Sequence, residues 1–275
     1  MLRFNDRSFA ALTVSAIGAT FLTLPAVASS SCDLSDGYPA SLSAYVTEAT
    51  TCIASNGDLR ADLADAVFDS INQERDAAEI APLTRNASLD QAAAAHAIDM
   101  MNRRYANHLD LEGRDHVFRV RAFNRSQLIG AVGANVLVAE SGANADDIFA
   151  TIKADDLNAK NLVREGFTDI GMAIAVSDGQ PFIVQVFAAV EGEFKSELPL
   201  TVSKNTAIRA DLNDANRNVI GWSLTEQASG DLIARGKAAR LRAASFESAQ
   251  TANLDVVVSD QASIYTLKGP AIEAQ

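Results

Sequence analysis

The chain has 275 residues, 48% of them hydrophobic and 21% charged, which is a globular composition and excludes disorder throughout its length. Its 23 basic residues stand against 35 acidic ones, and the net charge of -12 disfavours binding to a nucleic-acid backbone or to an anionic membrane surface. Two cysteines are too few for a cysteine-rich zinc site or an iron–sulfur site.

The first 28 residues have the pattern of a secretory signal peptide. Arg3 and Arg7 precede an apolar stretch that ends at Leu24, and Ala26-Val27-Ala28 supplies the small residues of a cleavage site. A membrane anchor is the alternative, but the stretch is shorter than the roughly 20 apolar residues that a spanning helix needs. We therefore expect a secreted or periplasmic protein with no transmembrane segment in the mature chain.

Residues 29–58 are expected to form an N-terminal segment that is tethered by a disulfide. In an oxidising compartment, Cys32 and Cys52 most simply pair with each other, although two unpaired buried thiols remain the alternative. Apolar residues at helical spacing predict a helix within 38–53. The disulfide would hold this helix to the mature N-terminus.

Residues 59–190 predict a mixed domain with three long helices. Apolar residues recur every three to four positions over 59–80, and Ser88 with Gln91 forms a capping-box pattern at the start of a second helix. The other elements expected here are a short helix over 115–122, a strand over 133–139, a helix over 143–163, and strands over 170–176 and 182–190. Asp178-Gly179 predicts a hairpin turn between the last two strands.

After residue 190 the pattern changes to short, regularly spaced β segments. Ile220, Trp222 and Leu224 alternate along one of them and so share one face of a strand. The expected segments are 199–202, 207–212, 218–224, 232–236, 254–258 and 263–267. We therefore expect residues 191–275 to form a small all-β domain, an antiparallel sandwich, with the boundary within 191–197.

Seven short pieces of the sequence, taken in order, resemble one known family. They are Ile71-Asn72-Gln73-Glu74-Arg75, Pro82-Leu83 followed by Leu89, Ala93, His96 and Asp99-Met100, Tyr105-Ala106-Asn107-His108, Arg119, Gly133-Ala134-Asn135-Val136, Ile170-Gly171-Met172-Ala173 and Val184-Gln185-Val186-Phe187. The family is the CAP superfamily of cysteine-rich secretory, antigen-five and pathogenesis-related proteins, and the closest likeness is to its short bacterial branch. The resemblance implies an α+β fold, a CAP-like α-β-α sandwich with a shallow cavity on the sheet.

The resemblance also implies a cavity in which two histidines and acidic residues bind a divalent cation, and here that set is incomplete. His108 matches the first histidine, but Ala134 replaces a glutamate and Asn158 stands where the second histidine is usual. One imidazole and one amide are too weak a set for a catalytic metal, so we expect no metal, no cofactor and no catalytic residue. Glu140 or Asp155 as a substitute carboxylate is the alternative.

The sequence identifies no reaction, and three functions stay open. The first is a non-catalytic binding or envelope-associated module whose cavity, lined by His108, Asn135 and Asn158, takes a small apolar or glycan-like ligand. The second is a metal-assisted hydrolase that uses His108 with a substitute carboxylate. The third is a secreted protein with a purely structural role. A serine hydrolase is disfavoured because no Gly-x-Ser-x-Gly motif is present. His96 is expected to be a packed structural residue, and His116 a solvated residue at a helix start.

Overall fold

The computed structural model describes residues 32–203, 206–237, 239–241 and 251–274, and the predicted signal peptide lies outside this range. The helices of the described residues are α1 (Leu42–Ser55), α2 (Ala61–Ala77), α3 (Ala87–Arg103), α4 (His116–Phe123), α5 (Ala145–Ala154) and α6 (Asp156–Leu162). In this part of the chain, no helix combines the length and the apolar character that crossing a membrane requires.

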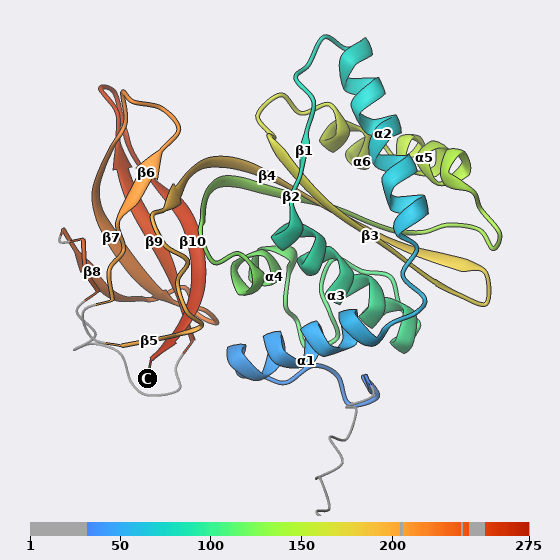
Figure 1. Ribbon diagram of the computed structural model, residues 1–275, viewed down its shortest axis with the longest axis horizontal. Helices are drawn as coiled ribbons and strands as arrows, with labels where there is room; N and C mark the ends of the chain where they lie inside the picture. Colours follow the sequence, from blue (N-terminus) through green and yellow to red (C-terminus); the bar gives the residue numbers. More distant parts are fainter. Residues whose placement is uncertain (1–31, 204–205, 238, 242–250, 275) are drawn as a thin grey trace, which may run out of the picture. The chain divides into compact units, whose positions relative to one another are not determined.

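The strands of the described residues belong to one sheet with the order β1-β3-β4-β2-β10-β9-β7-β8, while β5 pairs with β10 and β6 with β4. Their bounds are β1 (Thr84–Arg85), β2 (Gln127–Val138), β3 (Asp169–Ser177), β4 (Gln180–Phe194), β5 (Thr201–Val202), β6 (Ala210–Leu212), β7 (Asn218–Glu226), β8 (Leu232–Gly236), β9 (Thr251–Ser259) and β10 (Ile264–Ala274). Figure 1 shows this arrangement. The combination of six helices and a large sheet in the described residues confirms the α+β class.

Helices cover both faces of β2, β3 and β4 (Figure 1). α1, α3 and α4 share one buried core with Val184 and Val186 of β4. α2, α5 and α6 share a second core with Ile183 and Phe187 of the same strand. Because successive side chains of a strand point to opposite faces, the sheet separates the two cores. The result is the expected α-β-α layering.

The start of α3 differs from the prediction. Asn86, not Ser88, is the N-cap residue, and its side-chain oxygen accepts from the backbone N–H groups of Ser88 and Leu89. The Asn86 amide also donates to Gln127 and Asp169, at 2.8 and 2.9 Å. These two tertiary bonds hold the cap in place, which local sequence pattern could not reveal.

The single helix expected over 143–163 is two helices. The chain leaves the helical conformation at Asp155, and the Asp155 carboxylate accepts from the N–H groups of Leu157 and Asn158 at 2.9 Å. A side chain that satisfies free N–H groups starts a new helix at this point. By contrast, the hairpin at Asp178-Gly179 is confirmed: Ser177 pairs with Gln180, and both turn residues have positive φ angles of 53° and 77°.

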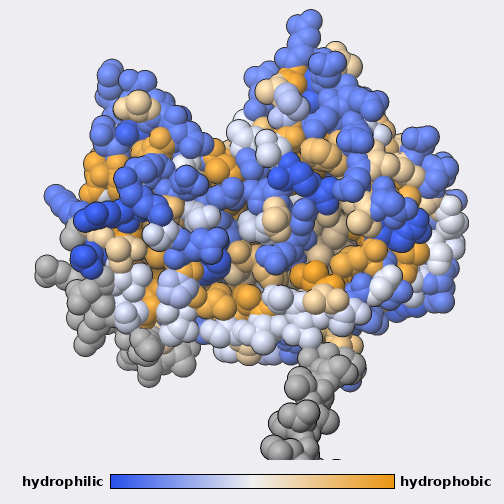
Figure 2. All heavy atoms as spheres, viewed as in Figure 1, coloured by the Kyte–Doolittle hydropathy of each residue, from blue (hydrophilic) through white to orange (hydrophobic). Residues whose placement is uncertain are grey.

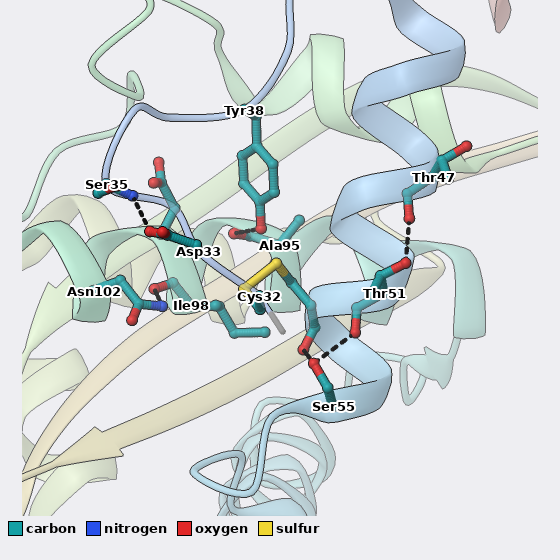
Figure 3. The surroundings of a disulfide bond; sticks show 12 residues. Cys32, Asp33, Ser35, Tyr38, Thr47, Thr51, Ser55, Ala95, Ile98 and Asn102 are labelled. Carbon is teal, nitrogen blue, oxygen red and sulfur yellow. Dashed lines mark hydrogen bonds between the residues drawn. A yellow bond between two sulfur atoms is a disulfide. The ribbon is translucent and has the colours of Figure 1, made fainter. Parts of the chain in front are cut away.

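The N-terminal segment is held by the expected disulfide between Cys32 and Cys52, shown in Figure 3. The Tyr38 hydroxyl donates to the Ala95 carbonyl of α3 at 3.2 Å, which fixes the turn before α1 (Figure 3). At the other end, Leu59 makes an isolated bridge with Ala175 of β3. The segment therefore covers α3 and reaches the edge of the sheet.

The C-terminal strands have a core of their own, centred on Trp222, Leu254 and Leu267. Leu128 of β2 and Phe194 of β4 also belong to this core. β4 runs without a break through the first residues of the expected boundary at 191–197, and β2 pairs with β10. The expected β-rich end of the chain is thus joined to the α-β-α part through shared strands.

Candidate functional site

The three predicted cavity residues lie on different faces of the sheet. Asn135 of β2 is directly opposite Gln185 of β4, which in turn faces Met172 of β3. Met172 belongs to the core under α2, α5 and α6, so Asn135 points to that side. His108 follows α3, and its carbonyl accepts from Arg119 of α4, whose neighbours line the opposite core. Asn135 and Asn158 come together, but His108 does not join them.

Asn135 is fully buried and is the centre of an amide network. Its amide nitrogen donates to the Gln185 side chain at 2.8 Å and to the Asn158 carbonyl at 3.1 Å. Asn161 of α6 donates to the Asn135 oxygen at 2.8 Å. All the strong hydrogen-bonding groups of Asn135 are therefore used to join β2, β4 and α6. Asn158 contributes its backbone carbonyl to this network.

His96 is 1% exposed, and its Nε2 lies 2.7 Å from the Asn107 carbonyl. Burial, together with the positive charge of Arg119, lowers the pKa of His96 to about 3. The ring is therefore neutral at pH 7, so Nε2 carries the proton and donates it to Asn107. The Nδ1 atom is buried without a partner. His96 thus has the structural role that its place on the helix predicts.

His108 and His116 are neighbours, with ring centroids 6.3 Å apart and the rings nearly perpendicular. His108 is exposed at the surface, whereas His116 is half-buried. Burial lowers the pKa of both rings, and the charge of Arg119 lowers it further, although Asp115 partly offsets this at His116. Both imidazoles are accordingly neutral at pH 7 and able to accept hydrogen bonds. Sequence spacing does not predict this proximity, because the two residues come from a loop and from a helix start.

Arg119 is the charge that dominates this part of the molecule. Its guanidinium is 1% exposed and donates to the carbonyls of Arg114 and His108, at 2.9 and 2.7 Å. The nearest carboxylate, that of Asp110, is 4.0 Å away. A buried positive charge directly behind His108 repels a cation that approaches the imidazole. The surroundings of His108 are therefore unfavourable for a divalent metal.

Within the described residues, one set of three acidic donors lies close enough together to suggest a metal site: Asp99, Asp110 and Glu112, with donor atoms within 4.8 Å of one another. Arg103 binds both Asp99 and Glu112, at 2.6 and 2.5 Å. Arg114 binds both Asp110 and Glu112, at 2.7 and 3.0 Å. The arginines already occupy the positions of a cation, so this cluster holds the loop after α3 in place. Asp and Arg at i and i+4 are the sequence signal that could have indicated it.

The two candidate substitute carboxylates, those of Asp155 and Glu140, lie at other places in the structure. One oxygen of the Asp155 carboxylate caps α6. Glu140 lines a polar cavity of about 380 Å³ together with Asp147 and Thr151 of α5. Neither makes an interaction with His108 in the part of the chain that the structure describes.

An apolar pocket of about 200 Å³ opens at the outer edge of β3. β1 pairs with this edge at Asp169 and Ile170 only, and Leu59 bridges to it at Ala175. Between these two points no strand of the described residues pairs with the edge. Ile53, Leu59, Ala61, Ala64, Ala94 and Met172 supply apolar walls. In Figure 2, hydrophilic residues predominate, and hydrophobic residues appear between them in separate patches, one of them over α3.

Comparison with known proteins identifies the class. Residues 68–187 match the model of the family described as the cysteine-rich secretory protein family, CAP. The chain therefore contains a CAP domain, and the resemblance seen in the sequence is confirmed. No protein with a curated description matches the chain.

Three bacterial structures are similar to this chain. An outer surface protein of Borrelia burgdorferi is 16% identical, with a TM-score of 0.43, and the match covers 48% of this chain and 95% of that one. An extracellular protein of Bacillus anthracis that contains an SCP domain is 21% identical, with a TM-score of 0.38, over 52% of this chain and 43% of that one. A cysteine-rich secretory protein of Staphylococcus aureus is 11% identical, with a TM-score of 0.35, over 46% and 38%. The matches to the last two span less than half of those chains.

Proposed function

We propose that this protein is a secreted or periplasmic CAP-domain module that binds a small apolar or glycan-like ligand and does not catalyse a reaction. The apolar pocket at the edge of β3 carries the proposal. An apolar cavity of about 150 Å³ is enough to bind benzene, and pockets for larger organic molecules begin near 300 Å³. A pocket of about 200 Å³ suits a single small apolar group, such as a ring or a short acyl chain.

The N-terminal segment supports a binding role because it completes this pocket. Ile53 comes from the last turn of α1 and Leu59 from the link to α2. The Cys32–Cys52 disulfide ties α1 to the residues before it, and these are bonded to α3 through Tyr38 and the Ala95 carbonyl, so one wall is fixed before any ligand arrives. A preformed wall lowers the entropy that binding would otherwise cost.

The rim offers polar groups that can orient a ligand. Arg85 is committed, since it donates to Asp90 at 2.6 Å and to the Met172 carbonyl at 2.9 Å. Arg60 is about half exposed and pairs with the exposed Asp62. Gln91 is exposed and lines the same rim. An apolar floor with amide and guanidinium groups above it fits an acyl chain with a polar head, and it also fits the apolar face of a sugar.

The alternative, a metal-assisted hydrolase at His108, has less support. Arg119 places a buried positive charge next to the imidazole, and Asp155 uses its carboxylate to cap a helix. No observation favours the alternative, so we do not pursue it.

Two alanine substitutions on α2 test the proposal. Ala61 and Ala66 are both exposed, but only Ala61 is among the residues that line the pocket. We expect Ala61→Leu to fill the pocket and Ala66→Leu to leave it open, with little effect on folding in either case. The measurement is ligand-observed NMR with octanoate as the apolar probe and N-acetylglucosamine as the glycan probe.

The expected result is binding of at least one probe to the wild type and to Ala66→Leu, with a loss of about tenfold or more in Ala61→Leu. Failure of both probes to bind the wild type at millimolar concentration would contradict the proposal. Equal binding by Ala61→Leu and the wild type would contradict it too.

A further inference from the structure

A second cavity, of about 310 Å³, lies among the C-terminal strands, and three of the residues that line it are basic, Lys195, Arg209 and Lys237. Among the described residues that line it, Asp211 is the only acidic one, and its carboxylate lies 3.1 Å from the Lys195 amine. The chain as a whole carries a net charge of -12. The described lining of this cavity, with three basic residues and one acidic residue, is therefore net positive, whereas the whole chain is net negative.

The three cations come from separate segments that the fold brings together. The Lys195 N–H donates to the Arg209 carbonyl at 2.9 Å, and the Ile208 N–H donates to the Ala239 carbonyl at 3.1 Å. The segment around Arg209 thus lies between the end of β4 and the chain that follows β8. Lys237 is the first residue after β8. Backbone hydrogen bonds between these segments therefore fix the positions of the three basic residues.

The cations remain available for a ligand. Arg209 and Lys237 are exposed, and neither forms an ion pair with a residue that the structure describes. Lys195 is shared with Asp211, but both side chains are more than half exposed, so this pair is weak. Like charges that converge on a hollow repel one another, and an anion bound between them relieves the repulsion.

The floor of the cavity is apolar and rigid. Trp222 of β7 is 5% exposed and is paired with Val256 of β9 and with Gly236 of β8. A Cβ atom added at Gly236 would lie 2.6 Å from the indole ring, which shows how closely β8 packs against it. At the rim, the register of β7 shifts between Val219 and Gly221, which leaves Ile220 outside the ladder. Bulges of this kind commonly lie beside binding sites.

From this geometry we propose that the cavity binds a small organic anion about the size of one sugar ring. A volume near 310 Å³ lies at the lower end of the range for organic ligands and is too large for a bare ion. The apolar floor contacts the body of the ligand, while Arg209 and Lys237 bind its charged group. The site is independent of the apolar pocket at β3, and the two proposals can fail separately.

Trp222 is the single tryptophan of the chain, so its fluorescence reports on this cavity alone. The probes are glucuronate for a carboxylate, glucose 6-phosphate for a phosphate, and neutral glucose as the control, each titrated at about 20 mM salt, where screening is weak. We expect saturable changes in tryptophan emission with one or both anions and none with glucose. The stronger anion identifies the charged group that the cavity prefers.

Charge variants make the test specific. In the double variant Arg209→Gln with Lys237→Gln, we expect affinity to fall about tenfold. Asp211→Asn removes the competing carboxylate and should raise affinity by a few-fold. Lys160→Gln on α6, an exposed lysine far from this cavity in the sequence, is the matched control and should have no effect. All of these side chains are exposed, so folding should be preserved.

Three outcomes would overturn the proposal: no emission change with either anion up to millimolar concentration, an equal response to glucose, or unaltered affinity in the double variant. A response that survives at high salt and in the double variant would show contact with the apolar floor only.

Discussion

At the scale of single residues, His96 shows how burial couples ionisation to stability. The ring is enclosed in the core between α3 and the loop after it, and its pKa is lowered to about 3, against about 6.5 in an unfolded chain. Below pH 6.5 the unfolded state binds a proton that the folded state excludes. The stabilising contribution of neutral His96 is therefore complete above pH 6.5 and is lost as the pH falls toward 3.

We predict that the free energy of unfolding decreases by up to about 1.4 kcal/mol per pH unit between pH 6 and 4 because of this residue, and that His96→Gln flattens the dependence. Glutamine retains an N–H donor for the Asn107 carbonyl but does not titrate in this range. Urea unfolding at a series of pH values measures the slope. His108→Gln, at the exposed neighbour, is the control and should change the slope less. Identical slopes for the wild type and His96→Gln would rule out this role.

The same scale explains why the sequence analysis assigned Asn135 to a ligand cavity. Asn135 matches the asparagine of the family's Gly-Glu-Asn motif, and the sequence alone could not distinguish a side chain that faces a ligand from one that joins strands. The structure shows that Gln185 and Asn161 use its amide. Gln185 Nε2 is left buried without a partner in this network.

At the scale of elements, the most consequential contact joins the two ends of the chain. Glu273, near the end of β10, accepts a hydrogen bond from the Leu42 N–H at 2.7 Å and from the N–H and hydroxyl of Ser43. Its carboxylate thus caps the first turn of α1, where the helix dipole favours a negative charge. The N-cap residue Ser41 makes a longer bond of 3.4 Å, so Glu273 is the main acceptor for this helix start.

We predict that Glu273→Gln lowers the free energy of unfolding by about 1 to 2 kcal/mol, because it removes a charge-assisted cap while preserving the shape of the side chain. Thermal unfolding followed by circular dichroism provides the measurement. Glu193→Gln in β4 is the control, since Glu193 is exposed and should be neutral to change. Equal melting temperatures for Glu273→Gln and the control would show that α1 does not depend on the C-terminal strand.

The sequence predicts most of the helices and strands, but it does not predict where they end or how they are connected. The apolar spacing of α2 and the Asp178-Gly179 turn are local signals, and both are confirmed. The break at Asp155 was missed because the apolar pattern continues across it, and β1 was missed because two residues carry no periodicity. The pairing of His108 with His116 depends on how the loop folds back, and no spacing rule encodes it.

For the whole molecule, the question is whether the α-β-α part and the C-terminal strands are separable. Arg121 of α4 donates to the Leu254 and Gly269 carbonyls and forms an ion pair of 2.6 Å with Asp255. Arg125 donates to the Ala271 carbonyl at 2.7 Å, and burial lowers its pKa to about 10, so it stays charged at pH 7. Buried Arg121 and partly buried Arg125 therefore have their acceptors in the chain that follows residue 197.

We predict that residues 29–190 alone are much less stable than the mature chain, because truncation removes the acceptors of Arg121 and Arg125 and the cap that Glu273 provides. A buried guanidinium that loses its partners typically lowers the free energy of unfolding by about 3 to 5 kcal/mol. Urea unfolding of the truncated and mature chains provides the comparison.

Because a truncated chain can fail to fold for other reasons, Arg121→Gln in the mature chain is the second test, with the exposed Arg235→Gln as its control. We expect Arg121→Gln to shift the midpoint strongly and Arg235→Gln hardly at all. If the truncated chain unfolds at the same midpoint as the mature one, and Arg121→Gln matches its control, then the two parts fold independently and the strands after residue 190 act as a separate module.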